Sequence, residues 1–190
     1  YVEKSADLDK AAVIVANAKL SRPSVCNSLD TIVVDKEILS PLMGRLLPLL
    51  TPYKVEVFAD ERSYPVLKDM AYPFLQEAVA ADFGREFLDF KCSVKVVSGI
   101  DEALAHITEF SSKHSEAILT QDNEAAEVFL NQVDAAAVYL NASTRFTDGQ
   151  VFGLGAEIGI STQKLHARGP FALEKLVTEK WIVRGEGQIR

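Results

Sequence analysis

Hydrophobic and polar residues alternate along the chain in two rhythms, one typical of helices and one typical of buried strands. After Ser5, the expected N-cap, apolar side chains recur at helical spacing from Leu8 to Val15. This helix should end before Pro23, because the residue preceding a proline is pushed out of the α region. Runs of largely β-branched or apolar residues predict strands at 31–34, 55–58, 94–97, 117–119 and 136–140. Further helices are expected at 36–50, broken or started afresh at Pro41, and at 101–110 and 123–132.

The order of these elements indicates the fold class. Strands that alternate with helices of about 10–15 residues imply βαβ units and a mainly parallel sheet with helices on both faces. The pattern is weaker between residues 60 and 90, where aromatic residues and prolines are scattered, and no internal repeat is visible. The sequence therefore predicts an α/β fold with an open, three-layer architecture.

The character of the chain changes after Leu140. Half of its ten glycines fall within residues 141–170, and a long glycine-rich loop in a compact domain is usually functional. Its GxGxxxG run at 153–159 differs from the dinucleotide fingerprint and lies in no early βαβ unit, so a Rossmann site is rejected. Beyond the loop, residues 180–183 could form a final strand whose edge would be covered by pairing with another subunit.

Composition narrows the classes of function. The 190 residues carry 27 acidic and 20 basic side chains, and this net charge of −7 argues against a nucleic-acid partner, which would need clustered Lys and Arg. Two cysteines cannot form a disulfide framework, and no CxxC or HxxxH spacing suggests a metal site. No apolar run approaches the roughly 20 residues of a membrane span. We expect a cytoplasmic protein, and the start at Tyr1 suggests a fragment.

Cys26 is the first candidate for chemistry. It lies between a helix end and a strand start, and Lys19 and Arg22 are close enough in sequence to favour a reactive thiolate. The alternative is that Cys26 packs as a small apolar residue, and without an identifiable partner histidine the spacing alone favours packing. Cys92, beside a predicted strand, fits packing better still.

The polar segment 141–148 and the three histidines give weaker signals. Arg145 could bind a carboxylate or phosphate through two parallel hydrogen bonds, or the segment could be a solvated loop. His106 shares a helix face with acidic residues and is expected at the surface, and His114 is expected in a polar loop before a strand. His166 could help to bind an anion or simply contact its loop.

Taken together, three segments resemble one known family. Residues 17–27, with Asn-Ala-Lys followed by Arg-Pro-Ser-Val-Cys-Asn, resemble the cysteine segment of the gamma-glutamyl phosphate reductase family. Residues 141–157 resemble the signature loop of that family, and the similarity runs on through 160–170. The intervening βα pattern is also similar, so the resemblance spans essentially the whole chain.

The resemblance implies a fold, a reaction and a set of site residues. The family belongs to the aldehyde dehydrogenase superfamily and reduces L-glutamyl 5-phosphate to L-glutamate 5-semialdehyde with NADPH, in proline biosynthesis. It implies that Cys26 is the nucleophile that forms a thioester. Glu86, in a run similar to a superfamily motif, would contact the nicotinamide ribose of NADPH. The residues implied to line the substrate pocket are Ser143, Thr144, Arg145 and Phe146.

The resemblance also implies a domain organisation, because family members are about twice as long as this chain. Residues 1–170 would form the catalytic domain with the substrate loop 141–170, and residues 171–190 an oligomerisation tail. The N-terminal NADPH-binding domain would be absent, and the isolated chain would be inactive. The expected partners are the acyl phosphate, further copies of the chain in a homo-oligomer, and glutamate 5-kinase. The alternatives are the reductase segment of a bifunctional pyrroline-5-carboxylate synthase and a non-catalytic oligomerisation module.

Overall fold

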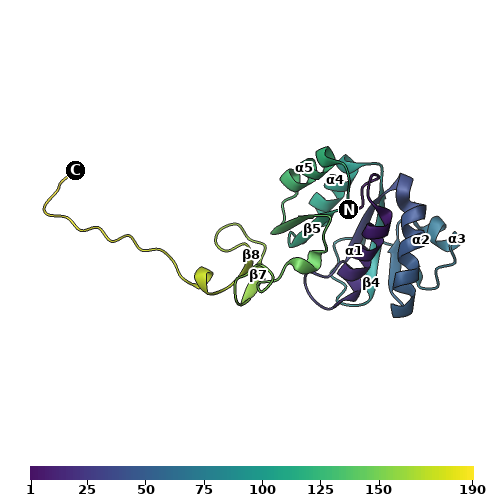
Figure 1. Cartoon of the computed structure of the whole chain (residues 1–190), viewed down its shortest axis with the longest axis horizontal. Helices are drawn as coiled ribbons and strands as arrows, with labels where there is room; N and C mark the ends of the chain where they lie inside the picture. The colour runs from purple at the N-terminus through teal and green to yellow at the C-terminus, as the bar shows by residue number, and fades with distance from the viewer.

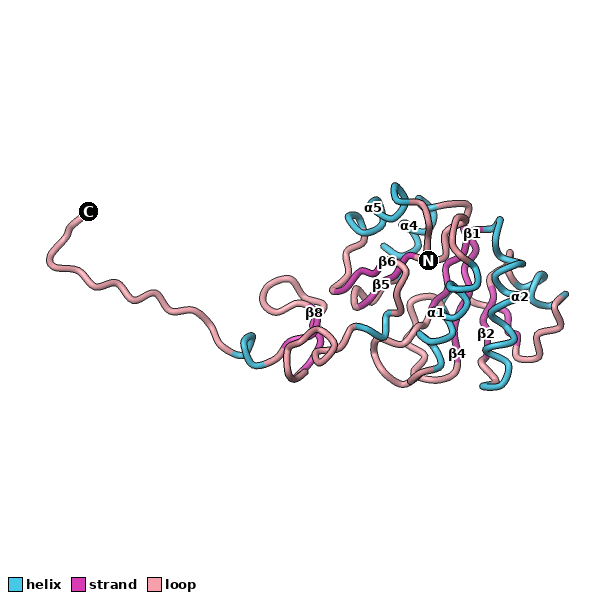
Figure 2. The backbone as a smooth tube through the Cα atoms, viewed as in Figure 1, coloured by secondary structure: helices cyan, strands magenta, loops and turns pink.

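The computed structural model describes residues 1–190 and places a parallel sheet between two layers of helices (Figures 1 and 2). The helices are α1 (Leu8–Leu20), α2 (Leu39–Leu50), α3 (Tyr64–Asp69), α4 (Ile100–Phe110) and α5 (Asn123–Gln132). The strands are β1 (Thr31–Asp35), β2 (Glu56–Ala59), β3 (Leu75–Glu77), β4 (Lys91–Val97), β5 (Ser115–Ile118), β6 (Ala137–Leu140), β7 (Gly159–Ser161) and β8 (Gly169–Phe171). None of the helices is long and apolar enough to cross a membrane.

The first residues of the chain join two sets of parallel strands. One set has the order β1-β4-β2-β3, and the other is the pair β5-β6. Val2 lies between them. It forms one parallel bridge to Val34 in β1 and another to Leu119, the residue that follows β5. Val2 N–H donates to the Val33 carbonyl at 2.8 Å, and Glu3 N–H donates to the Leu119 carbonyl at 3.0 Å. The strands therefore run side by side as one parallel sheet, β6-β5-(1–3)-β1-β4-β2-β3.

Strand β1 shows why both faces of the sheet are covered. Successive side chains of a strand point to opposite faces. Ile32 and Val34 belong to the large core cluster with α1, α2 and α3, whereas Val33 packs with Val97 and with Ala103 of α4. An uninterrupted apolar run is what a strand buried on both faces requires, so the predicted three-layer α/β architecture is confirmed.

Two details of the predicted helices are wrong. Asp7, not Ser5, is the N-cap of α1: its carboxylate accepts a hydrogen bond from Lys10 N–H at 3.2 Å. Ser5 is engaged elsewhere, since its N–H donates to the Glu3 carboxylate at 2.8 Å. Pro41 does not break α2, because the helix begins at Leu39 and its first-turn N–H groups need no helical partner. The bounds of α5 agree with the prediction at both ends.

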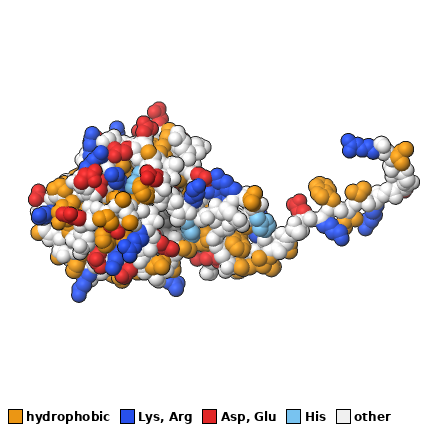
Figure 3. Space-filling view, turned by 180° about the vertical axis from the view of Figure 1, so that it is seen from behind, with side chains coloured by type: hydrophobic (Ala, Val, Ile, Leu, Met, Phe, Trp, Pro, Cys, Tyr) orange, Lys and Arg blue, Asp and Glu red, His pale blue; other side chains and the backbone are white.

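Residues 180–183 form no strand within the chain. The chain after β8 runs as an extended arm away from the sheet and its helices (Figures 1 and 2). Apolar side chains project from this arm in the space-filling view (Figure 3), and Trp181 and Val183 are both 90% exposed. Pairing of this segment with another subunit stays a prediction.

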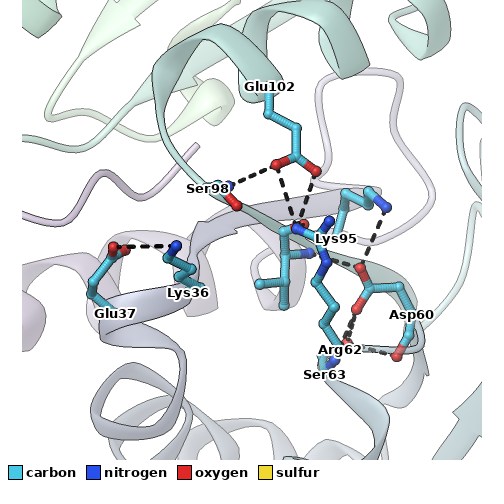
Figure 4. Close-up of polar contacts among 9 residues, drawn as sticks. Lys36, Glu37, Asp60, Arg62, Ser63, Lys95, Ser98 and Glu102 are labelled. Atoms are coloured by element: carbon cyan, nitrogen blue, oxygen red, sulfur yellow. Dashed lines mark hydrogen bonds and ion pairs between the residues drawn. The ribbon is translucent and has the colours of Figure 1, made fainter.

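The carboxyl ends of β2 and β4 are tied together by a saturated polar cluster (Figure 4). The buried Asp60 carboxylate accepts from Ser63 N–H at 2.8 Å and from Val96 N–H at 3.0 Å. Glu102 accepts from Ser98 N–H at 2.8 Å and from the Arg62 guanidinium at 3.1 Å. Backbone and side-chain donors occupy both carboxylates, so the cluster stabilises this end of the sheet and leaves no carboxylate oxygen pair for a ligand.

Truncation of Leu46 tests the core between α1, α2 and the sheet. Leu46 is fully buried in the large core cluster, so Leu46→Ala should lower the free energy of unfolding by about 2–5 kcal/mol through lost burial and a residual cavity. Leu49→Ala, in the same helix at a site 38% exposed, is the matched control and should cost less than about 1 kcal/mol. Urea unfolding followed by circular dichroism gives both values, and equal losses would contradict the packing described.

Candidate active site

A cavity of about 330 Å³ lies at the amino edge of the parallel sheet. Its walls come mainly from the segments that precede three strands: residues 26–31 before β1, 84–86 before β4, and the residues leading into β5. The last turn of α4, together with Tyr1, Val33, Thr144 and Thr162, completes the lining. Open parallel sheets usually bind ligands at the carboxyl ends of their strands, so the location of this cavity is unusual.

Cys26 is exposed in this cavity, in the turn between α1 and β1. The residue after it, Asn27, is buried and ties the turn to the segment after β6. Asn27 Nδ2 donates to the Thr147 carbonyl at 2.8 Å, and Thr144 Oγ1 donates to the Asn27 carbonyl at 2.7 Å. Two segments more than a hundred residues apart in sequence are thereby held together beside the thiol.

The electrostatic surroundings of Cys26 do not favour the thiolate. Partial burial raises the pKa of the thiol, the carboxylates of Glu157 and Glu86 raise it further, and nearby backbone N–H groups only partly offset these effects. The expected help from Lys19 is absent, because its ammonium is buried and occupied. It donates to the Asp89 carbonyl at 3.1 Å and pairs with Asp30 at 3.6 Å. Cys26 is therefore a thiol in this chain until a base or a substrate acts on it.

The structure brings some of the predicted site residues together and leaves others apart. Glu86 and Thr144 line the same cavity as Cys26. Ser143 is buried outside this lining, and its hydroxyl accepts from Arg145 N–H at 3.3 Å. The Arg145 guanidinium is turned to the surface, where Nε donates to Ser21 Oγ at 3.0 Å, and Phe146 is half exposed.

His106 is placed differently from its prediction. It was expected at the surface, yet it is only 8% exposed and lines the cavity. Its ring packs against Phe83 and Phe110, with centroid separations of 5.3 and 4.7 Å. Burial lowers the pKa of His106 to about 4, so the ring is neutral at pH 7. The sequence signal for this burial is Phe110, which lies one helical turn after His106 and so faces the same side of the helix.

His114 is the second histidine of the cavity that sequence reasoning did not assign to the site. It is buried, and its Nδ1 lies 2.7 Å from Ser115 Oγ. Ser115 Oγ lies 2.6 Å from Thr147 Oγ1, which in turn lies 2.7 Å from the Tyr139 hydroxyl. The other ring nitrogen, Nε2, is buried without a hydrogen-bond partner, and burial lowers the pKa of this histidine.

The charged groups around the cavity are mostly acidic. Asp30, Glu86 and Glu116 line it, against the single guanidinium of Arg85. No group of three or more His, Cys, Asp or Glu side chains is arranged to hold a metal ion. A nucleophilic thiol in a cavity that also holds a neutral imidazole suits acyl transfer. Glu86 makes no hydrogen bond or ion pair and is exposed, so its carboxylate is free to accept from the hydroxyl groups of a bound cofactor.

Comparison with known proteins gives a consistent result over the whole chain. No family model matches it. The chain is 55% identical over 192 residues to a gamma-glutamyl phosphate reductase of Pelodictyon phaeoclathratiforme, covering 100% of this chain and 46% of that protein. It is 51% identical over 190 residues to the Clostridium acetobutylicum gamma-glutamyl phosphate reductase, covering 100% of this chain and 44% of the relative.

Solved structures agree with these sequence matches. The gamma-glutamyl phosphate reductase of Thermotoga maritima superposes with a TM-score of 0.92 at 44% identity, covering 100% of this chain and 44% of that one. An acetylating aldehyde dehydrogenase of Geobacillus thermoglucosidasius, with a TM-score of 0.59 at 18% identity over 84% of this chain and 42% of its own, shares the fold alone. The chain thus has an aldehyde dehydrogenase-like α/β fold and spans slightly less than half the length of the curated relatives it matches.

The two cysteines should differ in their reaction with a thiol reagent. Cys26 is exposed, whereas Cys92 is buried and burial raises its pKa to about 12. A chromogenic disulfide should therefore label one thiol in the native chain and two in denaturant. Because the pKa of Cys26 is also raised, its labelling rate should still be climbing with pH above neutrality. A rate that levels off below pH 7, or equal labelling of Cys92, would contradict this description.

The burial of His106 predicts a loss of stability in mild acid. In the unfolded chain its pKa is about 6.5, and in the folded chain about 4. Between these values the unfolded state binds more protons, so the free energy of unfolding should fall as the pH is lowered from 6.5 toward 4. Urea unfolding of the chain and of His106→Leu across this range measures the effect. An identical pH dependence in the two proteins would show that His106 is not the buried titrating group.

Proposed function

Since the chain belongs to the gamma-glutamyl phosphate reductase family, we propose that it supplies the nucleophile of an enzyme that reduces L-glutamyl 5-phosphate to L-glutamate 5-semialdehyde with NADPH. The observation that carries the proposal is the exposed Cys26 thiol in a cavity shared with Glu86 and Thr144. The cysteine turn is anchored by Asn27 to the polar segment that follows β6. The alternative, a non-catalytic oligomerisation module, would need neither the exposed thiol nor the anchored cysteine turn.

In the first step, Cys26 sulfur attacks the acyl carbon of the substrate. The carbon–sulfur bond forms, the bond from carbon to the phosphate oxygen breaks, and a thioester remains on Cys26. Covalent catalysis of this kind divides one difficult displacement into two easier steps. The backbone N–H groups of Cys26 and Asn27 donate to no carbonyl and act on the Cys26 sulfur, so they are close enough to the attacked carbonyl to stabilise the oxyanion that develops there.

In the second step, the thioester carbonyl is reduced and the Cys26 thiolate leaves. NADPH supplies the hydride when it is bound. Glu86 is the residue of this cavity that would hold the cofactor, because its carboxylate is exposed and unpaired at the rim and can accept hydrogen bonds from ribose hydroxyls. The segments that flank Glu86 are fixed: Phe87 N–H donates to the Asp30 carboxylate at 3.1 Å.

We also propose a division of the chain into a catalytic part, residues 1–170, and an assembly tail, residues 171–190. Support comes from the exposure of apolar side chains on the tail, with Trp181 and Val183 90% exposed and Ile182 68% exposed. An extended segment with unpaired backbone groups and apolar side chains is suited to pair with a strand of a second copy. The resulting enzyme would be a homo-oligomer.

Substitution of the nucleophile tests the proposed function. In the full-length protein that contains this segment, Cys26→Ala should lower the rate of NADPH oxidation with L-glutamyl 5-phosphate by at least about 10³-fold, because thioester formation is lost. Cys92→Ala is the matched control and should retain activity within a few-fold, since Cys92 is buried in the core away from the cavity. Comparable activity of Cys26→Ala and the parent enzyme would refute the proposal.

A further inference from the structure

His114 has a polar atom for which the chain provides no partner. It is 8% exposed, its Nε2 is buried without a hydrogen bond, and the residue lines the same cavity as Cys26. A buried polar group left unsatisfied destabilises the folded chain. An unsatisfied nitrogen on a residue that lines the cavity of a nucleophile points to a partner that arrives with the reaction.

The hydrogen bonds on the opposite side of the ring indicate which nitrogen carries the proton. A buried N–H without an acceptor is rarer in proteins than an unsatisfied lone pair, so the bare nitrogen is Nε2 and the proton is on Nδ1. Nδ1–H then donates to Ser115 Oγ, and the hydroxyls of Ser115 and Thr147 donate outward in turn. The series ends at the half-buried Tyr139 hydroxyl, 2.7 Å from Thr147 Oγ1. This arrangement fixes the ring with Nε2 as a proton acceptor, as the third member of a catalytic triad does.

We propose that His114 is the general base that takes the thiol proton of Cys26 and delivers it to the departing phosphate. The inference rests on the proposed function and adds a catalytic residue to it. The S–H proton moves to Nε2 as the carbon–sulfur bond forms. As the carbon–oxygen bond breaks, Nε2 returns the proton to the phosphate oxygen and His114 is neutral again. After the hydride step, the Cys26 thiolate takes one proton from solvent, which is the proton consumed in each turnover.

The surroundings of the pair keep both groups neutral at rest. Burial lowers the pKa of His114 and raises that of Cys26, which by itself opposes proton transfer, so the proton moves only as the carbon–sulfur bond forms. The charged groups that act on His114 are Glu86, from the segment before β4, and Glu157, from the glycine-rich loop, and both favour the imidazolium once it forms. No hydrogen bond joins Cys26 to His114 in the structure, so the proton crosses through one water molecule or after the site closes on substrate.

His114→Asn is the direct test in the full-length protein. The asparagine amide keeps a donor for Ser115 at the position of Nδ1 and removes Nε2. Phosphate release from L-glutamyl 5-phosphate without NADPH isolates the first step, and its rate should fall by about 10²–10⁴-fold. In His114→Ala, added imidazole should restore part of the rate, an effect that a purely structural role would not produce. A rate within threefold of the parent enzyme, or no restoration by imidazole, would overturn the proposal.

His106→Gln is the matched control, because His106 is equally buried in the same cavity and also has an unpartnered Nε2. It should release phosphate within about threefold of the parent rate. A loss as large as that of His114→Asn would overturn the specific role of His114. If the parent enzyme itself releases no phosphate, the proposed function and this inference both fail. If the parent releases phosphate and His114→Asn matches it, only the role of His114 fails.

Discussion

The position of the first three residues in the middle of the sheet is the constraint on which the site depends. Val2 N–H donates to Val33 and Glu3 N–H donates to Leu119, so this short strand holds β1 and β5 at a fixed separation. Cys26 lies before β1 and His114 lies before β5, on the same edge of the sheet. Without the intervening strand, no backbone hydrogen bond would join these two halves, and the cavity would have no defined width.

The amino edge of a parallel sheet imposes a particular electrostatic setting. The carboxyl ends of the helices lie at this edge, and a helix carboxyl end carries partial negative charge. Helix α4 ends at Phe110, which lines the cavity. The carboxylates of Glu86 and Glu116 add to this field, opposed only by Arg85 among the lining cations. Such a field disfavours a resting thiolate, which agrees with the raised pKa of Cys26. It also means that an anionic substrate needs cations besides those of this cavity.

Local sequence pattern predicted β1, β2, β4, β5 and β6 because each contains a short apolar run, but it missed the short elements α3, β3, β7 and β8. It failed where tertiary contacts decide. Ser5 and Asp7 are both good caps, and Ser5 loses the role because Glu3 takes its N–H. Spacing singled out Cys26 but favoured packing for it, and only the family resemblance implied a catalytic role for Cys26 and site roles for Glu86 and Thr144. Resemblance carries spatial information that spacing lacks. The burial of His106 depends on Phe83, more than twenty residues away in sequence, so its pattern with neighbouring acidic residues was misleading.

The two histidines of the cavity have different neighbours, and we assign them different roles for that reason. His106 has aromatic neighbours and a buried Nε2 without a hydrogen-bond partner, and no hydrogen bond from a neighbouring side chain holds its ring. His114 is held by a series of hydroxyls that sets one nitrogen as donor and leaves the other as acceptor. A base must present its lone pair in a defined direction at the moment of proton transfer. That requirement selects the histidine with the ordered partner, because packing alone orients a ring without assigning its proton.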